Sequence, residues 1–155
     1  MVSCSEDPVE PTYSLAGKWK VTDITYEGTS TTSMAGMESS VNFTATGKSI
    51  NILTEFTETP NKVTSGGSYE VLMKMNYGGT EMEMTVPGFP FIMTGDWQKN
   101  GDKIIVSHNG EEQEADILQL DDKALKIGFN QTVVTEESGV SMEIQTKGVF
   151  VYTKQ

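Results

Sequence analysis

From Leu15 onward, short runs of alternating apolar and polar residues are separated by turn signals rich in glycine, asparagine and aspartate. A period of two is typical of β-strands with one buried face. We expect strands near residues 15–26, 39–46, 48–57, 69–77, 80–86, 91–98, 103–108, 111–117, 123–134 and 140–153. The pattern predicts an all-β fold: a single antiparallel up-and-down β-barrel of about 8–10 strands, with at most one short helical turn.

The segment Tyr69–Val86 gives the sharpest local prediction. Gly78-Gly79 at its centre permits the positive φ angles that a two-residue hairpin turn needs. Folding the segment about this turn puts two methionine pairs on one face and a charge pair on the other. The expected cross-strand partners are Met73–Met84, Met75–Met82 and Lys74–Glu83.

A second hairpin is expected at Lys103–Ile117, folded about Asn109-Gly110. Ile104 and Val106 then share a face with Ala115 and Ile117, and Lys103 meets Asp116 on the outside. Glu111–Leu120 is also rich in helix formers, so a helix is the alternative for this segment. The strand is favoured, because the Asn109-Gly110 turn, the apolar face and the charged face all fit the same hairpin register.

Two further features concern the connections. Val41, Phe43 and Ala45 alternate on one side of Thr46-Gly47, and Ile50, Ile52 and Phe56 alternate on the other side, which predicts a hairpin turning at Thr46-Gly47. The small polar residues of Thr29–Gly36 predict a loop, with one helical turn through Met34–Ser39. Thr57–Gly67, marked by Pro60 and Gly66-Gly67, predicts a second loop.

Composition limits the partners. The chain has 11 lysines and no arginine against 22 acidic residues, a net charge of −11, so nucleic acid is an improbable partner. The longest apolar run, Val149–Tyr152, is far too short for a membrane-spanning helix. One cysteine and one histidine argue against a disulfide framework and a histidine-based metal site. We expect no cofactor, no resident metal and a monomer.

Residues 1–14 contain two prolines and three acidic residues without a periodic apolar face, which predicts a disordered acidic tether. We expect residues 15–155 to form a single lipocalin-like barrel domain. Val2-Ser3-Cys4 resembles the end of a bacterial lipoprotein signal, and Ser5-Glu6-Asp7 resembles the acidic export signal of Bacteroidetes surface lipoproteins. The resemblance implies lipidation at Cys4, removal of a signal peptide, and a place in the cell envelope as an outer-membrane lipoprotein, on the surface if the export signal acts. The alternative is an ordinary free cysteine in a flexible tail.

Two Gly-x-Trp sites suggest a family. Gly17-Lys-Trp19 opens the first expected strand and resembles the lipocalin, or wider calycin, pattern; Gly95-Asp-Trp97 and Leu120-Asp-Asp-Lys-Ala-Leu125 resemble segments of lipocalin-like domains in bacterial lipoproteins. The resemblance implies that the glycines let the chain bend at the barrel floor, which the first tryptophan plugs. Lipocalins usually stack an arginine from the last strand on this tryptophan. This chain has no arginine, and Lys154 or Lys147 is the expected substitute.

The favoured function is binding of a small apolar or amphipathic molecule inside the barrel, because methionine-rich walls adapt to irregular ligands. The candidate lining is Met73, Met75, Met82, Met84, Phe89, Phe91 and Met93. The alternative is that these side chains simply fill the core.

Three other functions are weighed against ligand binding. Four clustered thioethers, with Met34 and Met37 as a further pair, suggest a Cu(I) site. A filled barrel could instead act as an interaction or inhibitor module through acidic loops at Asp121-Asp122 and Glu136-Glu137. Enzymatic activity is not expected, because the lone His108 falls at a hairpin tip without a positioned nucleophile.

Overall fold

The computed structural model describes residues 13–88 and 93–155, and these residues form one antiparallel sheet without a helix. An all-β fold of up-and-down, barrel-like type is therefore confirmed. Within the described ranges the strands are nine in number: β1 (Gly17–Met34), β2 (Met37–Thr57), β3 (Lys62–Tyr77), β4 (Thr80–Pro87), β5 (Gly95–Asn100), β6 (Lys103–His108), β7 (Glu111–Leu120), β8 (Ala124–Glu137) and β9 (Val140–Lys154).

The sheet closes into a ring through β3, which pairs with different neighbours along its length. The strand order is β2-β1-β9-β8-β7-β6-β5-β3-β4, and β2 also pairs with β3. The first residues of β3 pair with β5 through Lys62–Asp96 and Val63–Gly95. From Glu70 onward β3 pairs with β4 instead. The ring is thus closed only where β5, β6 and β7 are present.

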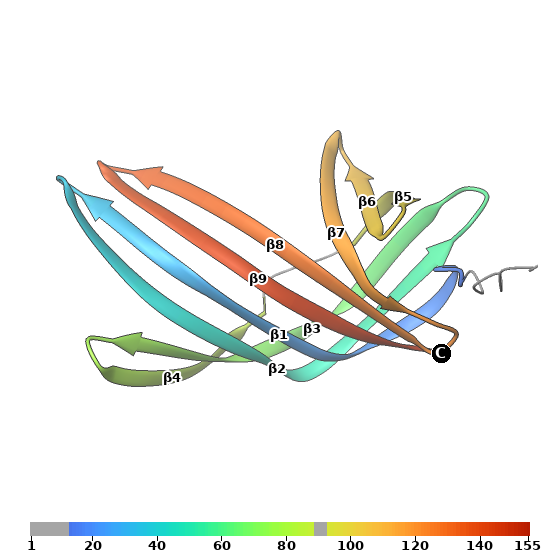
Figure 1. The fold of residues 1–155 in the computed structure, drawn as a ribbon, viewed down its shortest axis with the longest axis horizontal. Coiled ribbons are helices and arrows are strands. Elements are labelled where there is room, and N and C mark those ends of the chain that lie inside the picture. Colours follow the sequence, from blue (N-terminus) through green and yellow to red (C-terminus); the bar gives the residue numbers. More distant parts are fainter. Residues whose placement is uncertain (1–12, 89–92) are drawn as a thin grey trace, which may run out of the picture.

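Beyond that ring the longer strands continue as an open sheet in the order β4-β3-β2-β1-β9-β8. The hairpins β1–β2 and β8–β9 run far past β5–β7, and β3–β4 extends below them in the same direction (Figure 1). We call residues 27–44, 72–85 and 130–147 the open sheet, and the remaining described part of 15–155 the closed barrel. We call the side of the sheet that carries the buried core side chains its inner face, in the closed barrel and in the open sheet alike.

The closed barrel is packed with large apolar side chains from all around the ring. Those with almost no exposed surface are Leu15, Trp19, Val21, Ile24, Phe56, Val63, Val71, Met93, Ile104, Leu125, Ile127 and Phe150. Burying surface on this scale is the main force that drives a sheet to close on itself.

Both predicted hairpin registers are confirmed. Met73 pairs with Met84 and Met75 with Met82, while the Lys74 ammonium lies 3.8 Å from the Glu83 carboxylate. In the second hairpin Ile104 pairs with Ala115 and Lys103 with Asp116. The segment Glu111–Leu120 is a strand, so the helical alternative is wrong.

The hairpin predicted at Thr46-Gly47 is wrong, because β2 runs through these residues without turning. Its register with β3 shifts between Lys48 and Asn51, where Ser49 has a φ of 49°. This irregularity inserts an extra residue, so that Phe43 and Ala45 face inward before it and Thr54 and Phe56 after it. In the sequence, the inward-facing positions change from odd to even residue numbers at this point. A turn and a bulge both produce this change, so the pattern alone does not distinguish them.

The loop predicted at Thr29–Gly36 and the helical turn through Met34–Ser39 are also wrong. These residues continue β1 and begin β2, and the chain turns at Ala35-Gly36, where both φ angles are positive. Hydroxyl groups support the strands: the Thr29 hydroxyl donates to the Asn42 side-chain oxygen at 2.9 Å, and the Thr31 and Ser40 hydroxyls are 3.0 Å apart. Hydrogen-bonded polar side chains thus connect β1 and β2 across this part of the sheet.

The loop predicted at Thr57–Gly67 is shorter than expected. The chain turns over residues 58–61, and β3 begins at Lys62. Gly66 and Gly67 lie within β3, where they pair with Leu53 and Ile52 of β2. No helix among the described residues is long and apolar enough to cross a membrane.

Candidate functional site

The inner face of the open sheet is the principal candidate site. The strand register places equivalent residues side by side across the sheet, so this face can be followed in rows. One row runs Met82, Met75, Phe43, Gly28 and Thr146. The row next to it, on the side of the closed barrel, runs Met84, Met73, Ala45, Tyr26 and Gly148. The four methionines of the predicted pocket therefore lie at one edge of a surface that is mostly apolar, with Thr146 as the polar member of these two rows.

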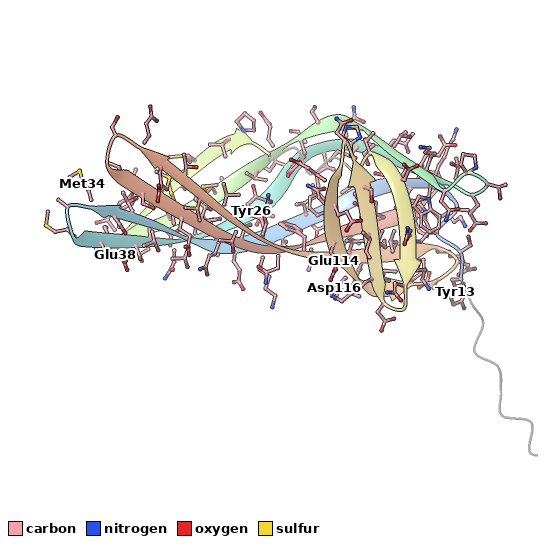
Figure 2. The ribbon with its side chains drawn as sticks, turned by 90° about the horizontal axis from the view of Figure 1, so that it is seen from above. Tyr13, Tyr26, Met34, Glu38, Glu114 and Asp116 are labelled. Atoms are coloured by element: carbon pink, nitrogen blue, oxygen red, sulfur yellow. The ribbon has the colours of Figure 1, made fainter. Side chains whose placement is uncertain are left out.

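Exposure on this face rises away from the closed barrel and toward the edge strand β4. Val71 is 0% exposed and Tyr26, at the centre of the molecule in Figure 2, is 4% exposed. Met84 is 38% exposed, and Met37 at the tip of the β1–β2 hairpin is 70% exposed. The large apolar side chains left exposed on this face are Met34, Met37, Tyr77, Met82, Met84, Val133 and Met142.

The predicted pocket residues do not all meet in one place. Met73 and Met75 are half-buried against the core, whereas Met82 is 45% exposed beside them on the edge strand β4. Met93 is buried in the closed barrel. Phe89, Phe91 and Cys4 lie outside the described residues. The structure thus brings the four hairpin methionines together and places Met93 in the filled interior.

An aromatic cluster forms the boundary between the filled barrel and the open face. Phe150 lies 5.4 Å from Phe129 and 6.1 Å from Tyr69, measured between ring centroids, and Phe129 makes an edge contact with Tyr26 at 6.3 Å. Burial raises the pKa of Tyr26, Tyr69 and Tyr152, so these phenols stay neutral in the folded protein. These aromatic rings form an apolar layer between the filled core and the exposed methionines.

The two Gly-x-Trp sites form the far end of the closed barrel. Gly17 and Gly95 have φ angles of 131° and 144°, a region that side-chain-bearing residues rarely adopt. Trp19 is fully buried, and its indole N–H donates to the Leu15 carbonyl oxygen at 2.8 Å. Trp97 donates in the same way to the Thr57 carbonyl oxygen at 3.0 Å. Both sites therefore combine a bend with a tryptophan whose one polar group is satisfied.

Lys154 takes the place that the lipocalin resemblance assigns to an arginine. Its ammonium group lies 5.4 Å from the centre of the Trp19 ring, which is within cation–π distance. Of the two predicted substitutes, Lys154 therefore makes the contact. Lys147 lies on β9 in the open sheet, opposite Glu27.

The polar candidates His108 and Asp121 both lie at the ends of strands, next to turns. His108 ends β6, where its ring nitrogen is 3.1 Å from the Asn109 amide nitrogen. The described residues contain no group of three or more His, Cys, Asp or Glu side chains placed to hold a metal ion. Hydrogen bonds from the Gln119 side chain and from the backbone N–H groups of Lys123 and Ala124 lower the pKa of Asp121. The Asp121 carboxylate thus stabilises the turn between β7 and β8.

Sequence reasoning named Met34 and Met37 only as a thioether pair for Cu(I), and it missed the rest of the site contributed by β1, β2, β8 and β9. Met34, Met37, Val133 and Met142 alternate with polar residues as core residues do, and only their position beyond the ends of β5–β7 leaves them exposed. The available signal was length: the hairpins β1–β2 and β8–β9 have many more residues than β5–β6.

The comparisons with known proteins leave the chain's family open. No protein-family model, no curated protein and no solved structure matches it.

Proposed function

We propose that this protein is a lipocalin-like, extracytoplasmic lipoprotein that binds one small amphipathic molecule. The apolar part of the ligand lies against the inner face of the open sheet, beside the four hairpin methionines. The observation that carries the proposal is the mostly apolar inner face, which begins in the core and ends in the exposed methionines. Exposed apolar patches of this kind mark binding surfaces in soluble proteins.

The filled interior directs the ligand to the open sheet. Trp19, Phe56 and Phe150 fill the closed barrel, and the aromatic cluster closes the end of the barrel that meets the open sheet. Met82 and Met84, by contrast, present flexible and polarizable side chains to solvent, and such side chains adapt to ligands of irregular shape. The open sheet therefore replaces the barrel interior as the proposed binding surface.

Charge suggests the kind of head group. The open sheet carries seven carboxylates and two lysines. Only Glu137 of these carboxylates lies on the same face as the methionines, so the field that acts on the ligand is mainly that of the protein's net charge of −11. This field favours a ligand whose polar end bears a positive charge and disfavours an anionic one. A zwitterionic amphiphile with a terminal trimethylammonium group is a suitable probe.

The direct test is a titration of the full chain with dodecylphosphocholine below its critical micelle concentration. We expect saturable binding at one-to-one stoichiometry, with chemical-shift changes in the methyl signals of Met75, Met82 and Met84. The Met93 methyl signal should not move. Laurate, with a similar chain and an anionic head, should bind more weakly.

A paired substitution locates the site. Met82→Gln keeps the length of the side chain but makes the exposed face more polar, so it should weaken dodecylphosphocholine binding without unfolding the protein. Leu118→Gln, at an exposed apolar residue of the closed barrel, is the matched control and should leave binding unchanged. Unchanged binding in the Met82 variant would contradict the proposed site.

Lipidation at Cys4 is the part of the proposal that concerns location. Two or more acyl chains on one residue would hold the protein stably at a membrane, whereas one chain gives only marginal binding. The native protein should incorporate labelled fatty acid, and the Cys4→Ser variant should not. Labelling of the Cys4→Ser variant would contradict this assignment.

A Cu(I) site remains the second candidate because two methionine pairs are adjacent on one hairpin face. Thioethers are soft ligands that suit Cu(I). Competition with a chromogenic Cu(I) chelator would detect such a site. Loss of competition in Met73→Ile and Met84→Ile would support it, and equal behaviour of the wild type and both variants would exclude it.

A further inference from the structure

The outer face of the open sheet contains a hollow that differs chemically from the inner face of this sheet, which we call the methionine face. It has a volume of about 660 Å³ and spans β1, β2, β3, β4, β8 and β9. This volume is within the range of roughly 300–1,000 Å³ that small-molecule sites occupy. Because alternate residues of a strand point to opposite faces, the lining side chains are not those of the apolar face.

The first row across the hollow mixes charges of both signs. Lys147 pairs with Asn130 on one side and with Glu27 on the other, Glu27 pairs with Thr44, and Thr44 pairs with Lys74. All five residues line the hollow, and all five are exposed.

The second row is rich in amides. Gln145 pairs with Thr29, Thr29 with Asn42, and Asn76 with Glu81, and these residues also line the hollow. The Thr29 hydroxyl donates to the Asn42 side-chain oxygen at 2.9 Å. That bond orients the Asn42 amide so that its NH₂ group is presented as a donor. Phe43 and Met75 contribute only from behind, because their side chains belong to the inner face.

The formal charge of the hollow is balanced although the protein is strongly acidic. Among the lining residues Glu27 and Glu81 oppose Lys74 and Lys147, within a chain whose net charge is −11. Two further carboxylates lie beside the lining: Glu83 is 3.8 Å from the Lys74 ammonium, and Glu143 accepts a hydrogen bond from the Gln145 amide at 2.6 Å. Balance disfavours both a strongly anionic and a strongly cationic ligand. Carboxylates accept hydrogen bonds, ammonium groups donate them, and each amide does both.

A ligand that matches this lining must be neutral and must donate and accept hydrogen bonds at many points. Hydroxyl groups meet both conditions, since each has one donor and two acceptor lone pairs. We propose that the outer hollow binds a neutral polyhydroxylated molecule of the size of a mono- or disaccharide. This site is independent of the methionine face, on the opposite side of the same strands.

The test is an NMR titration of the full chain that follows the side-chain NH₂ signals of its asparagines and glutamines. The neutral probes are maltose, cellobiose, lactose and trehalose. We expect at least one to shift the signals of Asn42, Asn76 and Gln145 saturably. Glucuronate and glucosamine, which carry a charge, should bind more weakly than that disaccharide. Tighter binding of either charged sugar would overturn the inferred neutrality.

Substitutions separate a specific site from weak surface association. Asn42→Leu removes one amide from the hollow and should weaken disaccharide binding about fivefold, the effect of one hydrogen bond of about 1 kcal/mol. Gln98→Leu is the control, because it removes an exposed amide from β5 in the closed barrel. Absence of a saturable shift with every neutral disaccharide, or equal binding by both variants, would overturn the proposal.

Discussion

The closed barrel and the open sheet share the strands β1, β2, β3, β8 and β9, and they differ in what lies opposite their inner face. β2 has 21 residues and would span about 70 Å, whereas β6 has 6 residues and spans about 20 Å. Where β5, β6 and β7 are present, apolar side chains from opposite walls fill the interior. Where these strands end, the same alternation continues and exposes methionine and valine to solvent. Strand length, rather than residue pattern, thus decides which apolar side chains are core and which form a surface.

An alanine substitution should destabilise the closed barrel more than the open sheet, and we expect the largest loss of stability at the Trp19 end of the barrel. Trp19→Ala removes a fully buried ring that also makes a hydrogen bond, so it should lower the free energy of unfolding by about 3–5 kcal/mol. Met82→Ala, on the open sheet, should cost less than about 1 kcal/mol. Chemical denaturation of the two variants measures both values, and similar losses would remove the distinction between the two regions.

A second substitution tests the boundary between the regions. Gly28 lies where the open sheet begins, and a Cβ atom there would come within 2.2 Å of the Gln145 carbonyl oxygen and 2.5 Å of the Phe43 ring. Gly28→Ala should therefore destabilise the protein by about 1–3 kcal/mol through overpacking. Denaturation curves would show the loss. An unchanged midpoint would mean that the open sheet relaxes more easily than a packed face does.

A smaller effect is expected from the contact between Lys154 and Trp19. Lys154→Gln removes the cation but keeps a chain of similar reach, and should cost about 0.5–1 kcal/mol. Lys154→Arg should keep the contact, because a guanidinium group stacks well on an aromatic ring. Equal stability of the Gln and Arg variants in thermal melts would show that the charge above the ring contributes nothing.

The smallest effect concerns a turn and depends on pH. The pKa of Asp121 is lower in the folded protein than its usual value of about 3.9, so its carboxylate stabilises the fold above that pH. This contribution is lost as the pH falls below about 3.9 and through the folded pKa. The melting temperature of Asp121→Ala should therefore lie below that of the wild type at pH 7, and the gap should close on acidification. Asp122→Ala is the control, and a gap that stays constant with pH would contradict the assignment.

The sequence predicted the fold wherever alternation and turn chemistry agreed. The Met73–Met84 and Ile104–Ala115 registers followed from Gly78-Gly79 and Asn109-Gly110, because a slip of one residue would have exchanged both faces. It failed at Thr46-Gly47, where a bulge changes the phase of alternation within one strand. The local pattern of apolar and polar residues does not distinguish a turn from a bulge, because either one changes which residues face inward.

The candidate site was predictable only in part for a related reason. The sequence identified the methionine pairs, but an inward-facing methionine looks the same whether an opposite wall covers it or not. Exposure of Met82 depends on where β5 and β6 end, which is a property of the whole ring. The outer hollow escaped detection because its residues, such as Asn42 and Asn76, are ordinary polar positions until the sheet curves around them.

The central claim is that one continuous inner face is filled in the closed barrel and open in the sheet beyond it. Relaxation of the methionine methyl signals by a soluble, inert gadolinium chelate tests this most directly. We expect strong relaxation for Met37, Met82 and Met84, less for Met73 and Met75, and almost none for Met93. Protection of Met82 and Met84 to the same degree as Met93 would show that the face is covered in solution, and would contradict the account.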